Sequence, residues 1–106
     1  MRIPFALLLA LSLFADWRES NITAIQRVID LYQARLECLK QDEAIPCIER
    51  HPLEPKSDAL AKTFSMSFPK SFYKATLERD IELLEKEKLC YGKALSPQEA
   101  EICFKH

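Results

Sequence analysis

The sequence predicts an all-α domain of two long antiparallel helices, each followed by a short helix that a disulfide links to it. Three observations support this fold class. The chain of 106 residues contains a single glycine, whereas β-sandwiches and barrels need many glycines in their turns. Leu, Glu, Lys and Ala, which favour helices, are abundant. The four cysteines form two pairs with similar flanking sequences.

The N-terminal segment 1–15 has the features of a secretory signal peptide. Arg2 precedes an apolar run, and the small residue Ala15 precedes the polar Asp16. The run has twelve positions, fewer than the roughly 20 that span a bilayer, so cleavage is favoured over an uncleaved membrane anchor. Residues 16–106 then form one small exported domain. The bacterial periplasm is the expected compartment, with secretion or membrane anchoring as the alternatives.

The first long helix is predicted from Asp16 to Lys40, because apolar residues recur there in steps of three and four. The residues of this stripe are Ile22, Ile25, Ile29, Tyr32, Leu36 and Leu39. The charged residues of the segment, Arg35 among them, are expected to lie mostly outside the stripe.

The second long helix is predicted from Pro69 to Tyr91, with Ser67 as its N-cap and Gly92 as its C-terminal stop. A short helix follows, because Ser96–Glu99 has the sequence of a capping box with proline at the first helical position. The apolar stripe of the long helix contains Tyr73, Leu77, Ile81, Leu84 and Tyr91.

The segment between the long helices is predicted to hold the other short helix and a connector. The short helix starts near Asp42 or Pro46 and ends before Pro52, which cannot continue it. The connector, residues 51–67, is expected to contain one helical turn from Ser57 to Phe64, capped by Ser57.

The flanks of the second cysteine in each pair match. Glu43–His51 and Glu99–His106 both contain Glu-Ala, two further residues, Cys and an apolar residue, and end in His. The match and the order of elements indicate one helical unit used twice, over residues 17–51 and 69–106.

Local disulfides, Cys38–Cys47 and Cys90–Cys103, are the predicted pairing. In an antiparallel arrangement Cys38 and Cys90 lie about 30 Å apart by helix rise, whereas a disulfide requires Cα atoms within about 7 Å. Parallel helices would instead permit pairs between the two units. A short exported chain with an even number of cysteines favours disulfides.

Metal or redox handling is the alternative use of these residues, because thiolate and imidazole are soft ligands that suit zinc or copper. The gaps of eight and twelve residues within the cysteine pairs are long for zinc sites, so no metal or other cofactor is expected. The alternative ligand set would be Cys38, Cys47, His51, Cys90, Cys103 and His106.

The aromatic residues near the connector could form a surface for a partner protein, or fold over the core. They are Phe64, Phe68, Phe72 and Tyr73. Asn21-Ile22-Thr23 also matches an N-glycan acceptor, which makes Asn21 a candidate modification site.

Composition argues against two classes of function. The net charge is −1 and there is no Lys/Arg block, so nucleic acid is not an expected partner. Both histidines lie beside cysteines and no acid–base site is evident, so an enzyme is not expected. The leading interpretation is a non-enzymatic binding or assembly module of the cell envelope with a protein partner; the oligomeric state stays open.

Two features that contain the cysteines partly resemble known proteins. The helical cysteine pairs resemble those of coiled-coil-helix-coiled-coil-helix proteins of the mitochondrial intermembrane space, but that family's pairs are evenly spaced and this chain is not assigned to it. The segment Cys90–Cys103 is similar to a disulfide-closed turn in small exported bacterial domains, including a lysozyme-inhibitor type. That likeness implies export and adds inhibition of an envelope hydrolase as a variant of the binding interpretation.

Overall fold

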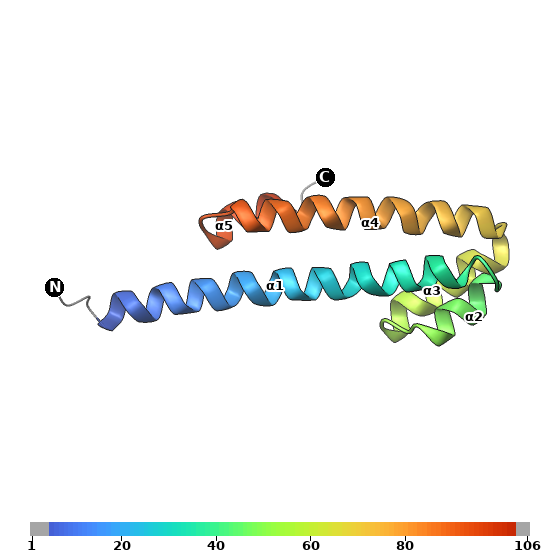
Figure 1. The fold of residues 1–106 in the computed structure, drawn as a ribbon, viewed down its shortest axis with the longest axis horizontal. Coiled ribbons are helices and arrows are strands. Elements are labelled where there is room, and N and C mark those ends of the chain that lie inside the picture. Colours follow the sequence, from blue (N-terminus) through green and yellow to red (C-terminus); the bar gives the residue numbers. More distant parts are fainter. Residues whose placement is uncertain (1–4, 104–106) are drawn as a thin grey trace.

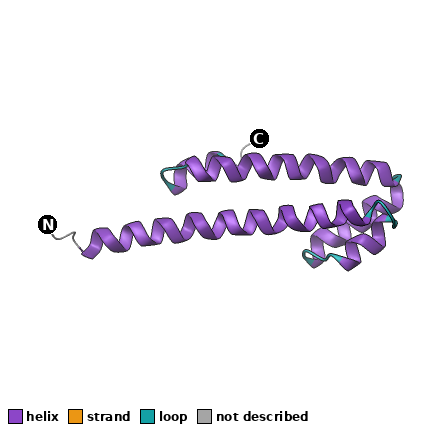
Figure 2. Cartoon of the chain, viewed as in Figure 1, coloured by secondary structure: helices purple, strands orange, loops and turns teal. Residues whose placement is uncertain are grey.

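A computed structural model describes the backbone of residues 5–103 and the side chains of residues 18–103 except 97 and 100. Within this part the chain is entirely helical and has no strand (Figures 1 and 2), which confirms the predicted all-α class. The five helices are α1 (Phe5–Cys38), α2 (Ala44–Arg50), α3 (Pro55–Ser67), α4 (Lys70–Lys93) and α5 (Pro97–Ile102).

The two longest helices, α1 and α4, run antiparallel and side by side, and they give the molecule its elongated shape (Figure 1). Helices α2 and α3 pack together against the end of this hairpin where α1 finishes and α4 starts. Helix α5 folds back at the opposite end of α4.

Helix α1 begins at Phe5 rather than at Asp16, so the helix includes most of the predicted signal peptide. The apolar run supplies leucine and alanine, which favour helix. Among residues 5–103, no helix is both long and apolar enough to cross a membrane.

Two clusters of buried residues hold the helices together, and both predicted stripes contribute to them. The first cluster joins the middle of α1 to the C-terminal half of α4 through Ile25, Ile29, Ile81, Tyr91 and Ala94. The second fixes α2 and the start of α4 to the end of α1 through Leu39, Ala44, Cys47, Ile48, Tyr73 and Leu77. Tyr32 and Leu36 pack against both clusters, so the core is continuous along the hairpin.

The connector differs from its prediction, because it forms the complete helix α3 rather than one turn. The helix starts one turn earlier than expected, with Glu54 as N-cap and Pro55 as the first helical residue. The hydroxyl of Ser57 donates to the Glu54 carbonyl oxygen at 3.3 Å and does not cap the helix. Proline at the first helical position explains this start, because its fixed φ suits a helix and its missing N–H is not needed there.

Two predicted boundary residues of the second long helix also have other roles. Ser67 ends α3, where its hydroxyl donates to the Thr63 carbonyl oxygen at 3.2 Å, and Pro69 is the residue that caps α4. Gly92 lies inside the last turn of α4 and has no positive φ. The helix ends at Lys93, and the N–H of the C-cap residue Ala94 donates to the Tyr91 carbonyl oxygen.

One half of the predicted capping box of the last short helix is present in the structure. The Glu99 N–H donates to the Ser96 hydroxyl oxygen at 3.2 Å. The Glu99 carboxylate accepts the N–H of Leu95 at 2.8 Å, one residue before the position that a reciprocal box would use.

Candidate functional site

Both predicted local disulfides are present. Cys38 and Cys47 have Cα atoms 5.7 Å apart, and Cys90 and Cys103 have Cα atoms 5.8 Å apart. Cys47 is completely buried, so the first disulfide anchors α2 within the core. The second disulfide fixes α5 against the end of α4.

The two cysteine units are similar in order but not in surroundings. Each long helix is followed by a turn and a short helix; α2 contains Cys47, whereas Cys103 directly follows the last residue of α5. Helix α2 then packs against α3, which has no counterpart after α5 within the described residues.

The residues of the alternative metal-ligand set are not available together as ligands in the described part of the chain. All four cysteines are in disulfides and therefore present no thiolate. His51 contributes its backbone carbonyl to another contact, and His106 lies outside the described residues. In the described part of the chain, no three or more His, Cys, Asp or Glu side chains lie together in a group that could hold a metal ion.

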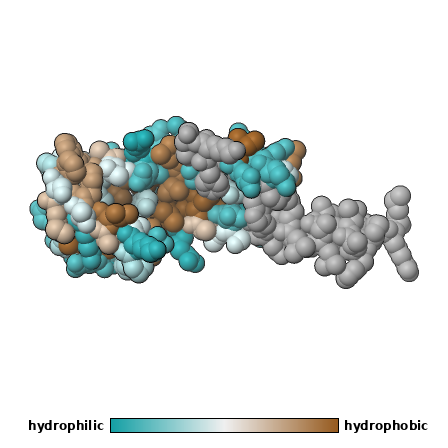
Figure 3. All heavy atoms as spheres, turned by 180° about the vertical axis from the view of Figure 1, so that it is seen from behind, coloured by the Kyte–Doolittle hydropathy of each residue, from teal (hydrophilic) through white to brown (hydrophobic). Residues whose placement is uncertain are grey.

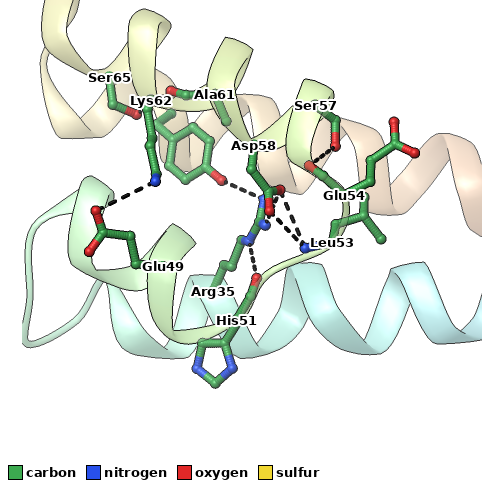
Figure 4. A network of polar contacts seen from close by, with 11 residues as sticks. Arg35, Glu49, His51, Leu53, Glu54, Ser57, Asp58, Ala61, Lys62 and Ser65 are labelled. Carbon is green, nitrogen blue, oxygen red and sulfur yellow. Dashed lines mark hydrogen bonds and ion pairs between the residues drawn. The ribbon is translucent and has the colours of Figure 1, made fainter.

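The sequence pattern predicted that the charged residues of α1, Arg35 among them, lie mostly outside the buried stripe, but Arg35 is buried. Its exposure is only 2 %, which makes it the buried charge of the described core. Figure 4 shows its guanidinium among groups from three segments. Nε donates to the His51 carbonyl oxygen at 2.9 Å, Nη2 to Asp58 Oδ1 at 2.8 Å, and Nη1 to the Tyr73 hydroxyl at 3.2 Å.

Asp58 extends this network into the loop before α3. Its carboxylate accepts the backbone N–H of Leu53 at 3.0 Å in addition to the Arg35 guanidinium (Figure 4). The ring of Tyr32 lies 5.8 Å from the Arg35 guanidinium carbon, within cation–π range. One side chain of α1 therefore fixes the positions of the α2–α3 loop, α3 and α4.

A second apolar stripe on α1 could have indicated that Arg35 is buried. Val28, Tyr32, Arg35 and Leu39 follow one another in steps of four, three and four. An arginine at such a position faces neighbouring helices and needs acceptors there. The acceptors come from residues distant in sequence, which the pattern does not identify.

Asp58, Tyr73 and Tyr32 in this network have shifted pKa values. Burial alone would raise the pKa of Asp58, but the hydrogen bonds from Arg35 and Leu53 and the charge of Arg35 lower it below its ordinary value of 3.8. Burial is the main cause of the raised pKa values of Tyr73 and Tyr32. The tyrosines are consequently neutral at pH 7, and Asp58 is ionised beside Arg35.

The lowered pKa of Asp58 predicts a pH dependence of stability. A carboxylate whose folded pKa is lower contributes stability above its unfolded pKa and loses it as the pH falls through the folded value. The difference in unfolding free energy between the wild type and D58N should therefore shrink below about pH 4. Urea unfolding from pH 7 to pH 2 measures it.

The matched control for this prediction is D30N, which removes an exposed carboxylate of α1 that accepts a hydrogen bond from Gln26 at 2.8 Å. It should keep the wild-type loss of stability at low pH. A difference between wild type and D58N that stays constant over the whole range would contradict the role given to the Asp58 charge.

Three of the four predicted partner-surface residues form a continuous aromatic surface, defined here as Phe64, Phe68 and Phe72. The ring centroids of Phe64 and Phe68 are 4.8 Å apart, and those of Phe68 and Phe72 are 5.7 Å apart. Phe64 also packs against the core. Phe68 and Phe72 remain 46 % and 51 % exposed.

Tyr73 does not belong to this surface, contrary to the sequence-based prediction. It is buried in the second core cluster and its hydroxyl accepts the hydrogen bond from Arg35. Consecutive residues of a helix point about 100° apart, so Phe72 faces outward while Tyr73 faces α1. Asn21, the glycan candidate, lies within α1 and is half-buried; its modification stays a prediction.

No family model, curated protein or solved structure matches this chain.

Proposed function

We propose that this protein is a non-enzymatic, exported binding module that presents its aromatic surface to another protein of the cell envelope. The observation that carries this proposal is the joint exposure of Phe68 and Phe72, which contact each other yet remain about half exposed. Exposed apolar patches often mark interaction sites, and aromatic side chains are frequent anchors of protein interfaces.

The neighbourhood of the aromatic surface extends its apolar character. Leu60 and Met66, both on α3, are also largely exposed. In Figure 3, which views the molecule from behind, hydrophobic atoms gather at the end of the hairpin that carries the α3–α4 turn and again along the middle of that face. A partner covering this end would remove several large apolar side chains from water.

The helices beneath the aromatic surface are fixed by hydrogen bonds and a disulfide, which supports a binding role. Phe72 is adjacent to Tyr73, which Arg35 connects to α1, and Asp58 connects α3 to the same guanidinium. The Cys38–Cys47 disulfide fixes α2, against which α3 packs. A surface held in one geometry loses less conformational entropy on binding than a mobile one.

The two disulfides indicate an oxidising, exported environment. Within it we propose the bacterial periplasm, with residues 1–15 removed as a signal peptide. Mass spectrometry of the protein isolated from the envelope should find a chain beginning at Asp16; a chain that retains Met1 would contradict cleavage.

The double substitution F68S/F72S is expected to abolish partner binding while leaving the fold intact. Both side chains are about half exposed, and surface substitutions usually change stability by about 0.5 kcal/mol or less. Tagged protein would be recovered from producing cells after reversible cross-linking, and co-purified envelope proteins quantified by mass spectrometry. Circular dichroism would establish that the variant is folded.

The matched control is L89S, because Leu89 is an apolar residue of α4 that is 66 % exposed but lies outside the aromatic surface. The proposal predicts proteins that co-purify with the wild type and L89S at equal levels and are lost with F68S/F72S. Equal recovery with all three chains would contradict it.

A further inference from the structure

A pocket of about 310 Å³ lies beside the aromatic surface, between α1, α3 and α4. Helix α3 supplies Leu60 and Phe64 to its lining, and Phe64 also belongs to the aromatic surface. Tyr32 of α1 and Tyr73 of α4 supply two aromatic rings. Ligand pockets range from about 300 to 1,000 Å³, so this pocket suits one extended side chain rather than a helix.

Of the two charged side chains in the pocket lining, one has an ion-pair partner and the other has none among the described residues. Arg35 lines it, but its guanidinium is already bonded to Asp58 at 2.8 Å. Asp80, the other charged residue of the lining, makes no hydrogen bond or ion pair with any described residue. Burial raises the pKa of Asp80, and the nearby charge of exposed Arg79 only partly opposes this effect. The pocket therefore contains one half-buried carboxylate without a cation bonded to it.

Another hollow, between α1 and α4, provides a contrast. It has a volume of about 570 Å³ and contains three lysines, but each lysine already has an acceptor. Lys40 pairs with Glu37 at 2.8 Å, Lys74 with Glu78 at 3.9 Å, and Lys70 donates to the Asp42 carbonyl at 3.3 Å. The lysines of this hollow therefore already have acceptors, whereas the Asp80 carboxylate has no bonded cation among the described residues.

We propose that this pocket receives an arginine side chain of the partner protein, flanked there by apolar residues. This inference rests on the proposed binding function and specifies the chemistry of its partner. A guanidinium can pair with Asp80 through two N–H groups and stack on the ring of Tyr32, which is only partly buried. Its aliphatic stem would cover Leu60 and Phe64. The apolar residues beside it would reach the aromatic surface, which is continuous with the pocket.

The test uses the purified full-length protein and two short peptides, acetyl-leucine-arginine-leucine-amide and the same peptide with citrulline in place of arginine. Citrulline has the shape of arginine without its charge. Titration followed by ¹H–¹⁵N correlation spectra should give saturable shifts around Leu60, Phe64 and Asp80 with the arginine peptide. The arginine peptide should bind about ten-fold tighter than the citrulline peptide, as a charge-assisted pair predicts.

Substitution at Asp80 completes the experiment. D80N should bind both peptides equally, whereas E85Q, which removes an exposed carboxylate elsewhere on α4, should keep the preference for arginine. No saturable shift, equal binding of both peptides to the wild type, or an unchanged preference in D80N would each overturn the inference. If F68S/F72S still loses its partner in that case, the proposed function stands and only the arginine site is wrong.

Discussion

Replacing Arg35 with methionine is expected to destabilise the protein by about 3–5 kcal/mol, the cost typical of breaking a buried ion pair. The side chains of Arg35 and Asp58 are only 3 % and 13 % exposed. Methionine fills similar space but donates no hydrogen bond. The Asp58 carboxylate, the Tyr73 hydroxyl and the His51 carbonyl would all lose a donor at once. Urea unfolding at pH 7 would measure the change.

The matched control is R27M, an exposed arginine on the same helix, which should change the unfolding free energy by about 0.5 kcal/mol or less. The double variant R35M/D58N should recover part of the loss, because it no longer leaves a buried carboxylate without a cation. Equal stability of R35M and R27M would contradict the central structural role of Arg35.

Removal of the Cys38–Cys47 disulfide by C38A/C47A is expected to cost about 3 kcal/mol through loop closure entropy alone. The cysteines are nine positions apart in sequence. Cys47 is fully buried, so its truncation also leaves a small gap in the core. Because one kcal/mol shifts the Tm of a domain this small by about 4–8 °C, thermal unfolding would detect the change readily.

The companion variant C90A/C103A provides the comparison. The Cys90–Cys103 disulfide joins cysteines thirteen positions apart, so its removal has a similar entropic cost of about 3 kcal/mol. Neither of these cysteines belongs to the second core cluster. C38A/C47A should therefore weaken both stability and partner binding, whereas C90A/C103A should lower stability with less effect on binding. A C38A/C47A protein as stable as the wild type would contradict the anchoring role of α2.

The long helices and the disulfides were predictable because their causes are local. Apolar residues at helical spacing identify a buried face regardless of what covers it. Helix rise separates Cys38 from Cys90 in an antiparallel hairpin, which leaves the two local pairs. The structure has both features.

Helix α3 was harder to predict because none of its residues is buried. Without a buried stripe, periodicity gives little indication of a helix, and only Pro55 at its start marked the boundary. The Arg35 network was hidden for another reason. Its acceptors lie 16, 23 and 38 positions further along the chain, and only the packing of four segments brings them together.

The exposure of neighbouring aromatic residues required the backbone as well. Phe72 and Tyr73 are adjacent in sequence, and either could face the core according to composition. The rotation of α4 about its own axis places Tyr73 against Arg35 and leaves Phe72 on the surface. Asp80 is similar, because its position in a pocket depends on α3 lying opposite.

Site-specific photo-crosslinking in producing cells tests the central claim, that the aromatic surface contacts a protein partner, most directly. A photoreactive phenylalanine analogue would replace Phe72 in one chain and Leu89, which is also exposed on α4, in another. The account predicts a discrete adduct of constant mass from position 72 and none from position 89. Identical adducts from both positions, or no adduct from position 72 of a folded chain, would contradict it.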